Sequence, residues 1–183
     1  MQVIDGWLDS AKRCESPNYN ARPEQTDVSL LVIHNISLPA GEFGTGCIEQ
    51  LFTNTLDCHA DERLLDLDGV EVSSHLLIDR EGQLTQFVSM NDRAWHAGES
   101  CFDGQKNCND FSIGIELEGV DDSPYTEQQY QSLVSVTLCL MNDYPALTVD
   151  RIVGHSDIAP GRKTDPGPAF DWSYYRQQLV AVV

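Results

Sequence analysis

The sequence predicts an α/β protein in which a mixed central β-sheet is flanked by helices. Short apolar runs and period-two segments, both typical of strands, alternate along the chain with segments whose apolar residues recur at helical spacing. The chain has 183 residues, of which 41% are hydrophobic and 22% are charged, an ordinary composition for a globular protein. We therefore expect residues 1–183 to form a single domain.

The first predicted elements are a buried strand and a short helix. Residues 29–33 form a run rich in branched apolar side chains, typical of a strand buried on both faces, and the run ends in His34 and Asn35. A loop rich in Gly and Pro spans residues 36–46. Apolar residues at i, i+3 and i+4 then predict a short helix, at Ile48, Leu51 and Phe52.

The middle of the chain predicts a hairpin and a second central strand. We expect strands at residues 75–79 and 83–88, joined by a turn at Glu81-Gly82. In residues 111–117 apolar side chains alternate with Ser, Gly and Glu. This period of two places Glu116 on the face opposite the core side chains, close to a glycine that leaves room above the sheet.

The last third predicts two helices and one strand. Thr126 and Gln129 have the spacing of a capping box, and the helix that follows ends at Tyr144-Pro145. Residues 149–153 are a short predicted strand. A final helix begins at about Asp171, and its predicted inward stripe consists of Tyr175, Leu179 and Val182.

The charge and the cysteines exclude several classes of protein. A formal net charge of −18 opposes binding to nucleic acid and to anionic lipid, which both favour basic surfaces. No apolar run approaches the roughly 18 residues that a membrane span needs, and the first residues lack the pattern of an export signal. The six cysteines include no C-x-x-C pair; their even number would permit disulfides in a secreted protein. We expect a cytoplasmic protein with reduced thiols.

The segment 154–167, Gly-His-Ser-Asp-Ile-Ala-Pro-Gly-Arg-Lys-Thr-Asp-Pro-Gly, is the strongest functional signal. Its three glycines and two prolines predict a shaped loop, and chemistry tends to occur in such loops on a rigid scaffold. His155 and Asp165 offer a nitrogen and an oxygen to a divalent metal, and Lys163 lies between them in the chain. A catalytic zinc needs three protein ligands and one open position, and His34 at a strand end would complete the set.

Each candidate also has an ordinary structural interpretation. A single histidine at a strand end is usually a hydrogen-bonded structural residue. Two strand-end histidines, His34 and His155, together with Asp165 in a loop rich in Gly and Pro, instead favour a metal site. Glu116 could be a solvated carboxylate or the general base that a metal-bound aspartate cannot be. Lys163 could be a surface lysine or a group that stabilises an oxyanion. Of the other histidines, we expect His59 to be solvated, His75 to lie in the core or behind the site, and His96 to line a pocket rather than bind metal.

Four long motifs carry a family resemblance. They are residues 32–43 (VIHNISLPAGEF), 93–98 (RAWHAG), 108–119 (CNDFSIGIELEG) and the loop 154–167. In this order, and over nearly the whole chain, they resemble the AmpD-type 1,6-anhydro-N-acetylmuramyl-L-alanine amidases. The wider family, the N-acetylmuramoyl-L-alanine amidases, has relatives among phage lysozymes and peptidoglycan-recognition proteins, which share the fold and the zinc site.

The resemblance implies a reaction and a site. It implies that one Zn²⁺ per chain is bound by His34, His155 and Asp165, that Glu116 activates water, and that Lys163 stabilises the tetrahedral intermediate. The implied reaction is hydrolysis of the amide between the lactyl group of 1,6-anhydro-N-acetylmuramic acid and L-alanine. This reaction serves peptidoglycan recycling, and the implied setting is a monomer in the bacterial cytoplasm.

The resemblance also implies contacts to an anhydro-muropeptide substrate. Trp95 would lie along the sugar, while Asn35 and Arg162 would contact the peptide stem, the latter because a guanidinium suits a carboxylate. Glu71 and Asn107 depart from the pattern, since basic residues are usual there, so contacts to substrate carboxylates at these positions are in doubt.

Two other functions compete with this one. A module that senses peptidoglycan fragments without cutting them would keep the groove but lack a ligand or the base, and all five residues are present. An amidase acting on intact wall would share the chemistry, and the missing export signal opposes it. The sequence does not specify which lengths of peptide stem the site accepts, or whether a loop within residues 41–68 must move to admit the substrate.

Overall fold

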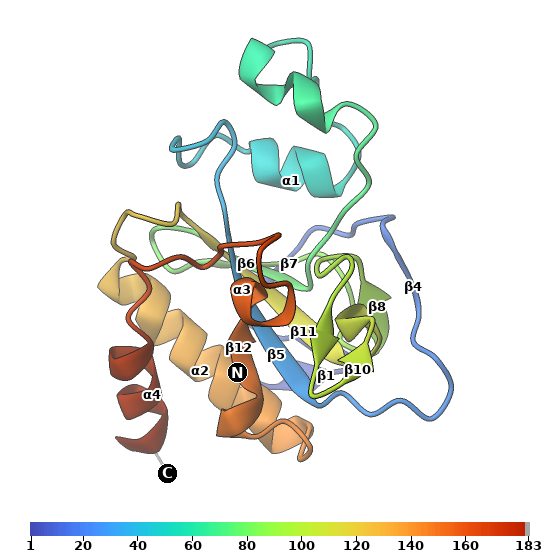
Figure 1. Ribbon diagram of the computed structural model, residues 1–183, viewed down its shortest axis with the longest axis vertical. Helices are drawn as coiled ribbons and strands as arrows, with labels where there is room; N and C mark the ends of the chain where they lie inside the picture. The colour runs from blue at the N-terminus through green and yellow to red at the C-terminus, as the bar shows by residue number, and fades with distance from the viewer. Residues whose placement is uncertain (182–183) are drawn as a thin grey trace.

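A six-stranded mixed sheet forms the centre of the computed structural model, which describes residues 1–181 (Figure 1). The strand order is β12-β5-β11-β6-β7-β3, and only β6 and β7 pair antiparallel within it. The strands are β3 (Lys12–Arg13), β5 (Leu30–Ile36), β6 (Leu76–Ile78), β7 (Leu84–Gln86), β11 (Ser112–Glu118) and β12 (Ile152–Gly154). This architecture confirms the predicted α/β class with a mixed sheet.

The two longest strands, β5 and β11, lie side by side in the middle of the sheet and are parallel. All seven residues of β11 are buried, so the strand is covered on both faces and not on one as the alternation predicted. Ile113, Ile115 and Leu117 point into the larger core with α2 and α4, as expected. Phe111 instead joins a second apolar cluster on the opposite face, because it precedes the strand and packs against Leu30 and Val32 of β5. Glu116 shares that face.

Helices α2 (Glu127–Asp143) and α4 (Trp172–Ala181) pack side by side over one face of the sheet (Figure 1). The predicted capping box is present: Thr126 Oγ1 accepts from the N–H of Gln129, and Gln129 Oε1 accepts from the N–H of Thr126. In α4, Tyr175 and Leu179 are buried as predicted, whereas Val182 lies outside the described residues.

The predicted hairpin is confirmed with shorter strands, because β6 and β7 pair only between residues 76–78 and 84–86. The predicted strand 149–153 is wrong in its first half. Residues 149–151 form a 3₁₀ turn, η3, closed by a hydrogen bond from Arg151 N to Thr148 O of 2.9 Å. Pairing with β5 begins only at Ile152, opposite Leu31, and the strand starts there.

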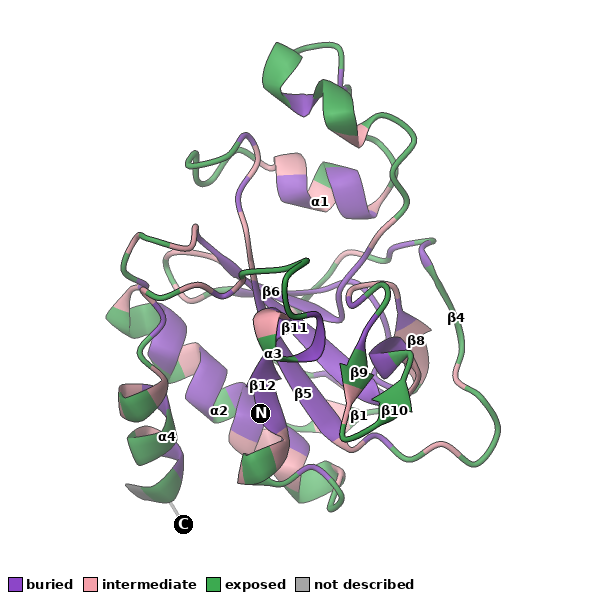
Figure 2. Cartoon of the chain, in the orientation of Figure 1, coloured by how far each residue is buried: buried purple, intermediate pink, exposed green. Residues whose placement is uncertain are grey.

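The predicted short helix is α1 (Cys47–Phe52), and its three predicted apolar residues are buried. With η1 (Glu62–Leu67) it forms a layer beyond the sheet (Figure 1). The remaining short elements, which the sequence patterns did not predict, are β1 (Val3–Ile4), β2 (Trp7–Leu8), β4 (Tyr19–Ala21), β8 (Asp92–Ala94), β9 (Cys101–Phe102), β10 (Gln105–Lys106), η2 (Cys108–Asp110) and α3 (His155–Ile158). Figure 2 shows the buried sheet between exposed outer helix faces.

Two further observations concern the whole chain. All six cysteines lie within the described residues and each is free. Among residues 1–181, no helix combines the length and the apolar character needed to cross a membrane.

Candidate metal centre

The carboxyl ends of three parallel strands bring the candidate site together. Glu116 of β11 lies in register with His34 of β5, and both side chains therefore point to the same face of the sheet. His155 is the first residue of α3, directly after β12 on the other side of β5. Asp165 lies on the loop that returns past α3, held by a 3.0 Å hydrogen bond from Ser156 N to its carbonyl oxygen. Sites in parallel sheets commonly form at this edge.

Three ligand atoms converge at this edge. His34 Nδ1 lies 3.0 Å from His155 Nδ1 and 3.0 Å from Asp165 Oδ2, and His155 Nδ1 lies 3.1 Å from Asp165 Oδ2. Among the described residues, these three side chains are the ones whose ligand atoms cluster closely enough to hold a metal ion. Both histidines are buried, while the aspartate side chain is 13% exposed.

In both imidazoles Nδ1 faces the cluster and Nε2 faces away from it. The hydrogen bond made by the outer nitrogen, Nε2, determines whether the inner nitrogen, Nδ1, carries a proton or a lone pair. His155 Nε2 lies 3.0 Å from the carbonyl oxygen of Ala97, so it carries the ring proton and donates it. A neutral imidazole has one such proton, so His155 Nδ1 presents a lone pair. His34 Nε2 lies 2.9 Å from His96 Nδ1 and can donate in the same way. Three electron-rich atoms then face one another with no proton between them, which suits a bound cation.

The pKa directions agree with ligands in their binding forms. Burial lowers the pKa of His34 to about 4, so its ring is neutral at pH 7. Burial alone would raise the pKa of Asp165, but hydrogen bonds that the His155 and His34 imidazoles donate when they carry a proton on Nδ1 outweigh it and lower that pKa, so the carboxylate stays ionised while a ring is protonated. Neutral imidazoles and an ionised carboxylate are the forms that bind metal.

Glu116 and Lys163 supply groups of opposite charge beside the three ligands. Glu116 is 8% exposed, and its Oε2 is buried without a hydrogen-bond partner among residues 1–181. Burial raises the pKa of this carboxyl well above its usual value, the charge of Asp165 adds to the effect, and Lys163 opposes it. Lys163 is exposed, and no described carboxylate lies within 4.0 Å of its ammonium.

The three predicted substrate contacts lie around this centre, each with a contact to the protein itself. The Asn35 amide donates to Asp121 Oδ1 at 2.8 Å and to the carbonyl of Pro166 at 3.1 Å. The indole N–H of Trp95 donates to Asn20 Oδ1 at 2.8 Å. Arg162 Nη2 donates to the carbonyls of Ala97 (2.7 Å) and Glu99 (2.6 Å).

The other histidines separate into one exposed and two packed residues. His59 is exposed, as predicted. His75 is fully buried in the core, where its Nδ1 accepts from the N–H of Gly114 at 3.0 Å. His96 is partly buried and directly contacts His34, a role that the sequence patterns did not reveal. The one sequence signal for this contact was that His96 lies in the motif 93–98, directly after Trp95 and two residues before Gly98.

The two departures from the family pattern lie in separate places. Glu71 is exposed beside α1 and η1. Asn107 lines a groove next to the site, together with Lys106 and Arg162. Its φ of 59° lies in the left-handed region, which Asn adopts more readily than most other residues, so the backbone here favours the residue that is present.

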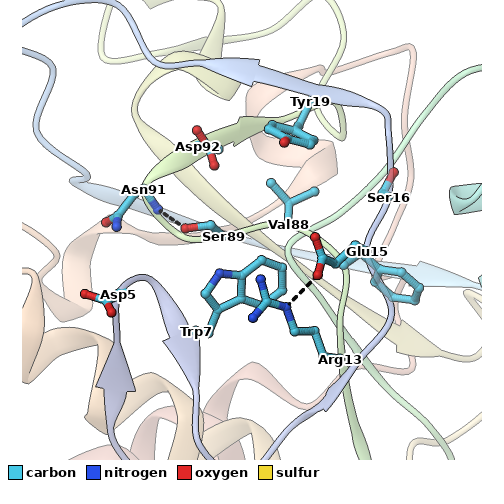
Figure 3. A pocket seen from close by; sticks show the side chains of 11 residues that line it. Asp5, Trp7, Arg13, Glu15, Ser16, Tyr19, Val88, Ser89, Asn91 and Asp92 are labelled. Atoms are coloured by element: carbon cyan, nitrogen blue, oxygen red, sulfur yellow. Dashed lines mark hydrogen bonds and ion pairs between the residues drawn. The ribbon is translucent and has the colours of Figure 1, made fainter.

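Another pocket, shown in Figure 3, lies between the amino-terminal strands and β8 and includes none of the site residues. Its most prominent aromatic ring, Trp7, is covered by the guanidinium of Arg13 at 3.7 Å from the ring centroid. Arg13 Nε also pairs with Glu15 at 3.0 Å. These groups satisfy one another, whereas the side chains whose ligand atoms could hold a metal lie at the sheet edge.

Known proteins of similar sequence and fold identify the family. The family model for N-acetylmuramoyl-L-alanine amidase matches residues 24–168. The 1,6-anhydro-N-acetylmuramyl-L-alanine amidase AmpD of Enterobacter cloacae is 52% identical over 180 residues, which cover 98% of this chain and 96% of that protein. The crystal structure of a selenomethionine AmpD derivative superposes with a TM-score of 0.95 at 50% identity, covering 98% of this chain and 99% of the other.

A third relative has been solved with a substrate. It is the N-acetylmuramyl-L-alanine amidase AmiD from Escherichia coli in complex with anhydro-N-acetylmuramic acid-L-Ala-D-γ-Glu-L-Lys. It is 30% identical with a TM-score of 0.61, and the alignment covers 86% of this chain and 60% of that one. The family model spans most of this chain and contains all five central residues of the site, and sequence identity near one half extends along its length. The chain belongs to the N-acetylmuramoyl-L-alanine amidase family.

Proposed function

We propose that this protein is a zinc-dependent 1,6-anhydro-N-acetylmuramyl-L-alanine amidase that serves peptidoglycan recycling. The bond that it hydrolyses is the amide between the lactyl group of 1,6-anhydro-N-acetylmuramic acid and L-alanine in muropeptides. Similarity to AmpD over nearly the full length supports the substrate class. The related AmiD binds an anhydro-muramyl peptide of the same type, which supports it further.

One observation carries the proposal: two imidazole nitrogens and one carboxylate oxygen converge beside a buried, unpartnered carboxylate oxygen of Glu116. The set of His34, His155 and Asp165 fits zinc in number and type, with one position left for water or substrate. The three ligand atoms lie 3.0–3.1 Å apart, close enough that one ion would contact all three.

Glu116 is the proposed general base. Zinc, when bound, supplies Lewis-acid chemistry to the scissile carbonyl and to water. The Glu116 carboxylate accepts a proton from the attacking water and delivers it to the departing nitrogen of L-alanine, so that the proton lost by water ends on the amine. Burial has raised the pKa of this carboxyl, which makes it a stronger base than a solvated glutamate.

Lys163 is the group that we propose stabilises the oxyanion. The lactyl carbonyl oxygen gains negative charge as water adds to its carbon, and a free ammonium beside the site stabilises that charge. Around this centre we propose that Trp95 lies along the sugar and that Asn35 and Arg162 contact the peptide stem. Only Nη2 of Arg162 is engaged by the described backbone, so its other donors are available to a carboxylate.

The proposal extends to the whole protein. We propose that residues 1–183 form one catalytic domain, that it acts as a monomer, and that it works in the bacterial cytoplasm. The six free cysteines support a reducing compartment, since proteins of oxidising compartments commonly pair them.

Product analysis tests the activity. Purified protein is incubated with an anhydro-muropeptide and, separately, with intact sacculi, and the products are identified by mass spectrometry. We expect free stem peptide and anhydro-N-acetylmuramic acid-containing sugar from the first substrate and little release from the second. Efficient release of stem peptide from sacculi would instead favour the alternative function, an amidase that acts on the intact cell wall.

Metal analysis tests the cofactor. We expect about one zinc per chain, because the three ligands form one site. His34→Ala, His155→Ala and Asp165→Ala should each lose zinc or hold it weakly, as measured by elemental analysis after gel filtration. His59→Ala is the matched control, since His59 is exposed and far from the cluster in the chain, and it should retain zinc. Full activity in protein shown to be metal-free contradicts the proposal.

A further inference from the structure

We infer that His96 is a positioning residue for the ligand His34, and that the two-residue segment His96–Ala97 orients both histidine ligands. The inference rests on the proposed metal site at His34, His155 and Asp165. It assigns a role to a histidine that takes no part in the proposed chemistry.

Two adjacent residues contact the outer nitrogens of both ligands. The His96 side chain places Nδ1 at 2.9 Å from His34 Nε2, and the Ala97 backbone places its carbonyl oxygen at 3.0 Å from His155 Nε2. The rings of His34 and His96 meet edge to face, with centroids 5.0 Å apart and an interplanar angle of 84°. The hydrogen bond on the outer nitrogen of a metal-bound histidine fixes both its tautomer and its ring orientation.

The direction of the proton between the two imidazoles follows from the site. If His96 Nδ1 donated to His34 Nε2, a neutral His34 would carry its proton on Nδ1, which faces His155 and Asp165 and would block a metal. If His34 Nε2 donates instead, Nδ1 presents its lone pair to the site. His96 then carries its own proton on Nε2, and Ser112 Oγ lies 3.2 Å away to accept it. Both hydrogen bonds, from His34 to His96 and from His96 to Ser112, are therefore made when His34 is in the tautomer that binds metal.

The segment is itself held from two sides. Asn109 Oδ1 accepts from the backbone N–H groups of both His96 (3.2 Å) and Ala97 (2.8 Å). The ring of His96 lies directly over Gly114 of β11, where a Cβ would come within 2.5 Å of the ring carbon Cγ. A side chain at position 114 would displace the ring, so the glycine gives His96 the space to reach His34. These contacts are what a fixed orienting group requires.

Matched variants at His96 test the inference. His96→Leu removes the acceptor, whereas His96→Asn has the same branched arrangement of side-chain heavy atoms as leucine and can place an oxygen near the position of Nδ1. Zinc affinity is measured by competition with a chromophoric chelator, independently of activity. We expect His96→Leu to bind zinc about 10–100-fold more weakly and His96→Asn to recover most of the loss. The proton on His34 Nε2 should be observed by NMR in the zinc-loaded wild-type protein and should exchange faster with solvent in His96→Leu.

A second pair addresses the case in which His96→Leu does not fold. Asn109→Leu removes the anchor of the segment, and Asn109→Asp keeps an oxygen that accepts from both N–H groups. We expect zinc affinity to fall in Asn109→Leu and to be largely retained in Asn109→Asp. Wild-type protein that binds no zinc contradicts the proposed function. Wild-type protein that binds zinc, with equal affinity in the leucine and the polar variants, contradicts this inference alone.

Discussion

Glu116 holds a buried carboxylate oxygen that no described residue satisfies, a costly arrangement that a structural role does not explain. A general base explains it, because that oxygen must be free to accept a proton from water. Glu116→Gln keeps the shape but removes the base, so turnover should fall about 10²–10⁴-fold. Zinc content and the melting temperature of the variant are the controls and should stay close to wild type. Near wild-type turnover would remove Glu116 from the mechanism.

Lys163 and Arg162 are adjacent cations to which we assign different tasks. Lys163 acts on charge that develops only in the transition state, so Lys163→Ala should lower kcat and kcat/KM together. Arg162 meets a carboxylate already present in the bound peptide, so Arg162→Ala should mainly raise KM. A lost charge-assisted contact costs about 1.5–3 kcal/mol.

The length of the substrate separates these two cations further. The Arg162→Ala penalty should shrink on muramyl-L-alanine, which lacks the distal carboxylates, and steady-state kinetics on both substrates at saturating zinc measure it. Saturating zinc matters because Arg162 also contacts the carbonyl of Ala97, which holds His155. Equal penalties on full and trimmed substrates would make Arg162 a structural residue.

At the scale of the element, the start of α2 is a local signal that also serves the tertiary structure. Thr126 Oγ1 accepts from the N–H of Gln129 and donates to the carbonyl of Arg80 at 2.8 Å, so one hydroxyl caps the helix and ties it to the turn before β7. Thr126→Ala should lower the free energy of unfolding by about 0.5–2 kcal/mol, measured by urea titration of the zinc-loaded protein. Thr126→Ser keeps the hydroxyl and should lose much less. Equal losses in the two variants would mean that the methyl group, not the cap, matters.

Elements with strong local signals were predictable, whereas elements made by tertiary pairing were not. The capping box, the run 29–33 and the hairpin at Glu81-Gly82 each carry their own signal. Two-residue strands such as β9 and β10 have no periodicity to detect. β12 begins where its neighbour β5 allows pairing, and no pattern within residues 149–153 contains that information. The same limit applies to β11, whose second buried face is created by residues distant in sequence.

At the scale of the whole molecule, topology explains how much of the site could be predicted. His34, Glu116 and His155 lie towards the carboxyl ends of neighbouring parallel strands, so strand-end position indicated that the two histidines meet, and the period-two alternation indicated the face of Glu116. The contacts of His96 and Asn109 depend on the path of the chain between β8 and β11, which composition and spacing do not specify. The sequence could therefore predict which side chains meet at the sheet edge but not which residues hold them in place.

The cysteines give a whole-molecule test of the compartment. Cys101 is exposed, Cys47 is half-buried, Cys58 and Cys108 are buried, and burial raises the pKa of the Cys14 and Cys139 thiols, which disfavours their reactive thiolates. Native, unreduced protein treated with a thiol reagent should therefore react first at Cys101, and Cys101→Ser should lose that rapid phase. After denaturation without reductant, the titration should rise to nearly six thiols per chain, because all six cysteines are free in the structure and the proposed compartment is reducing. Two or fewer thiols would mean disulfides, and with them an exported protein whose substrate is the intact wall.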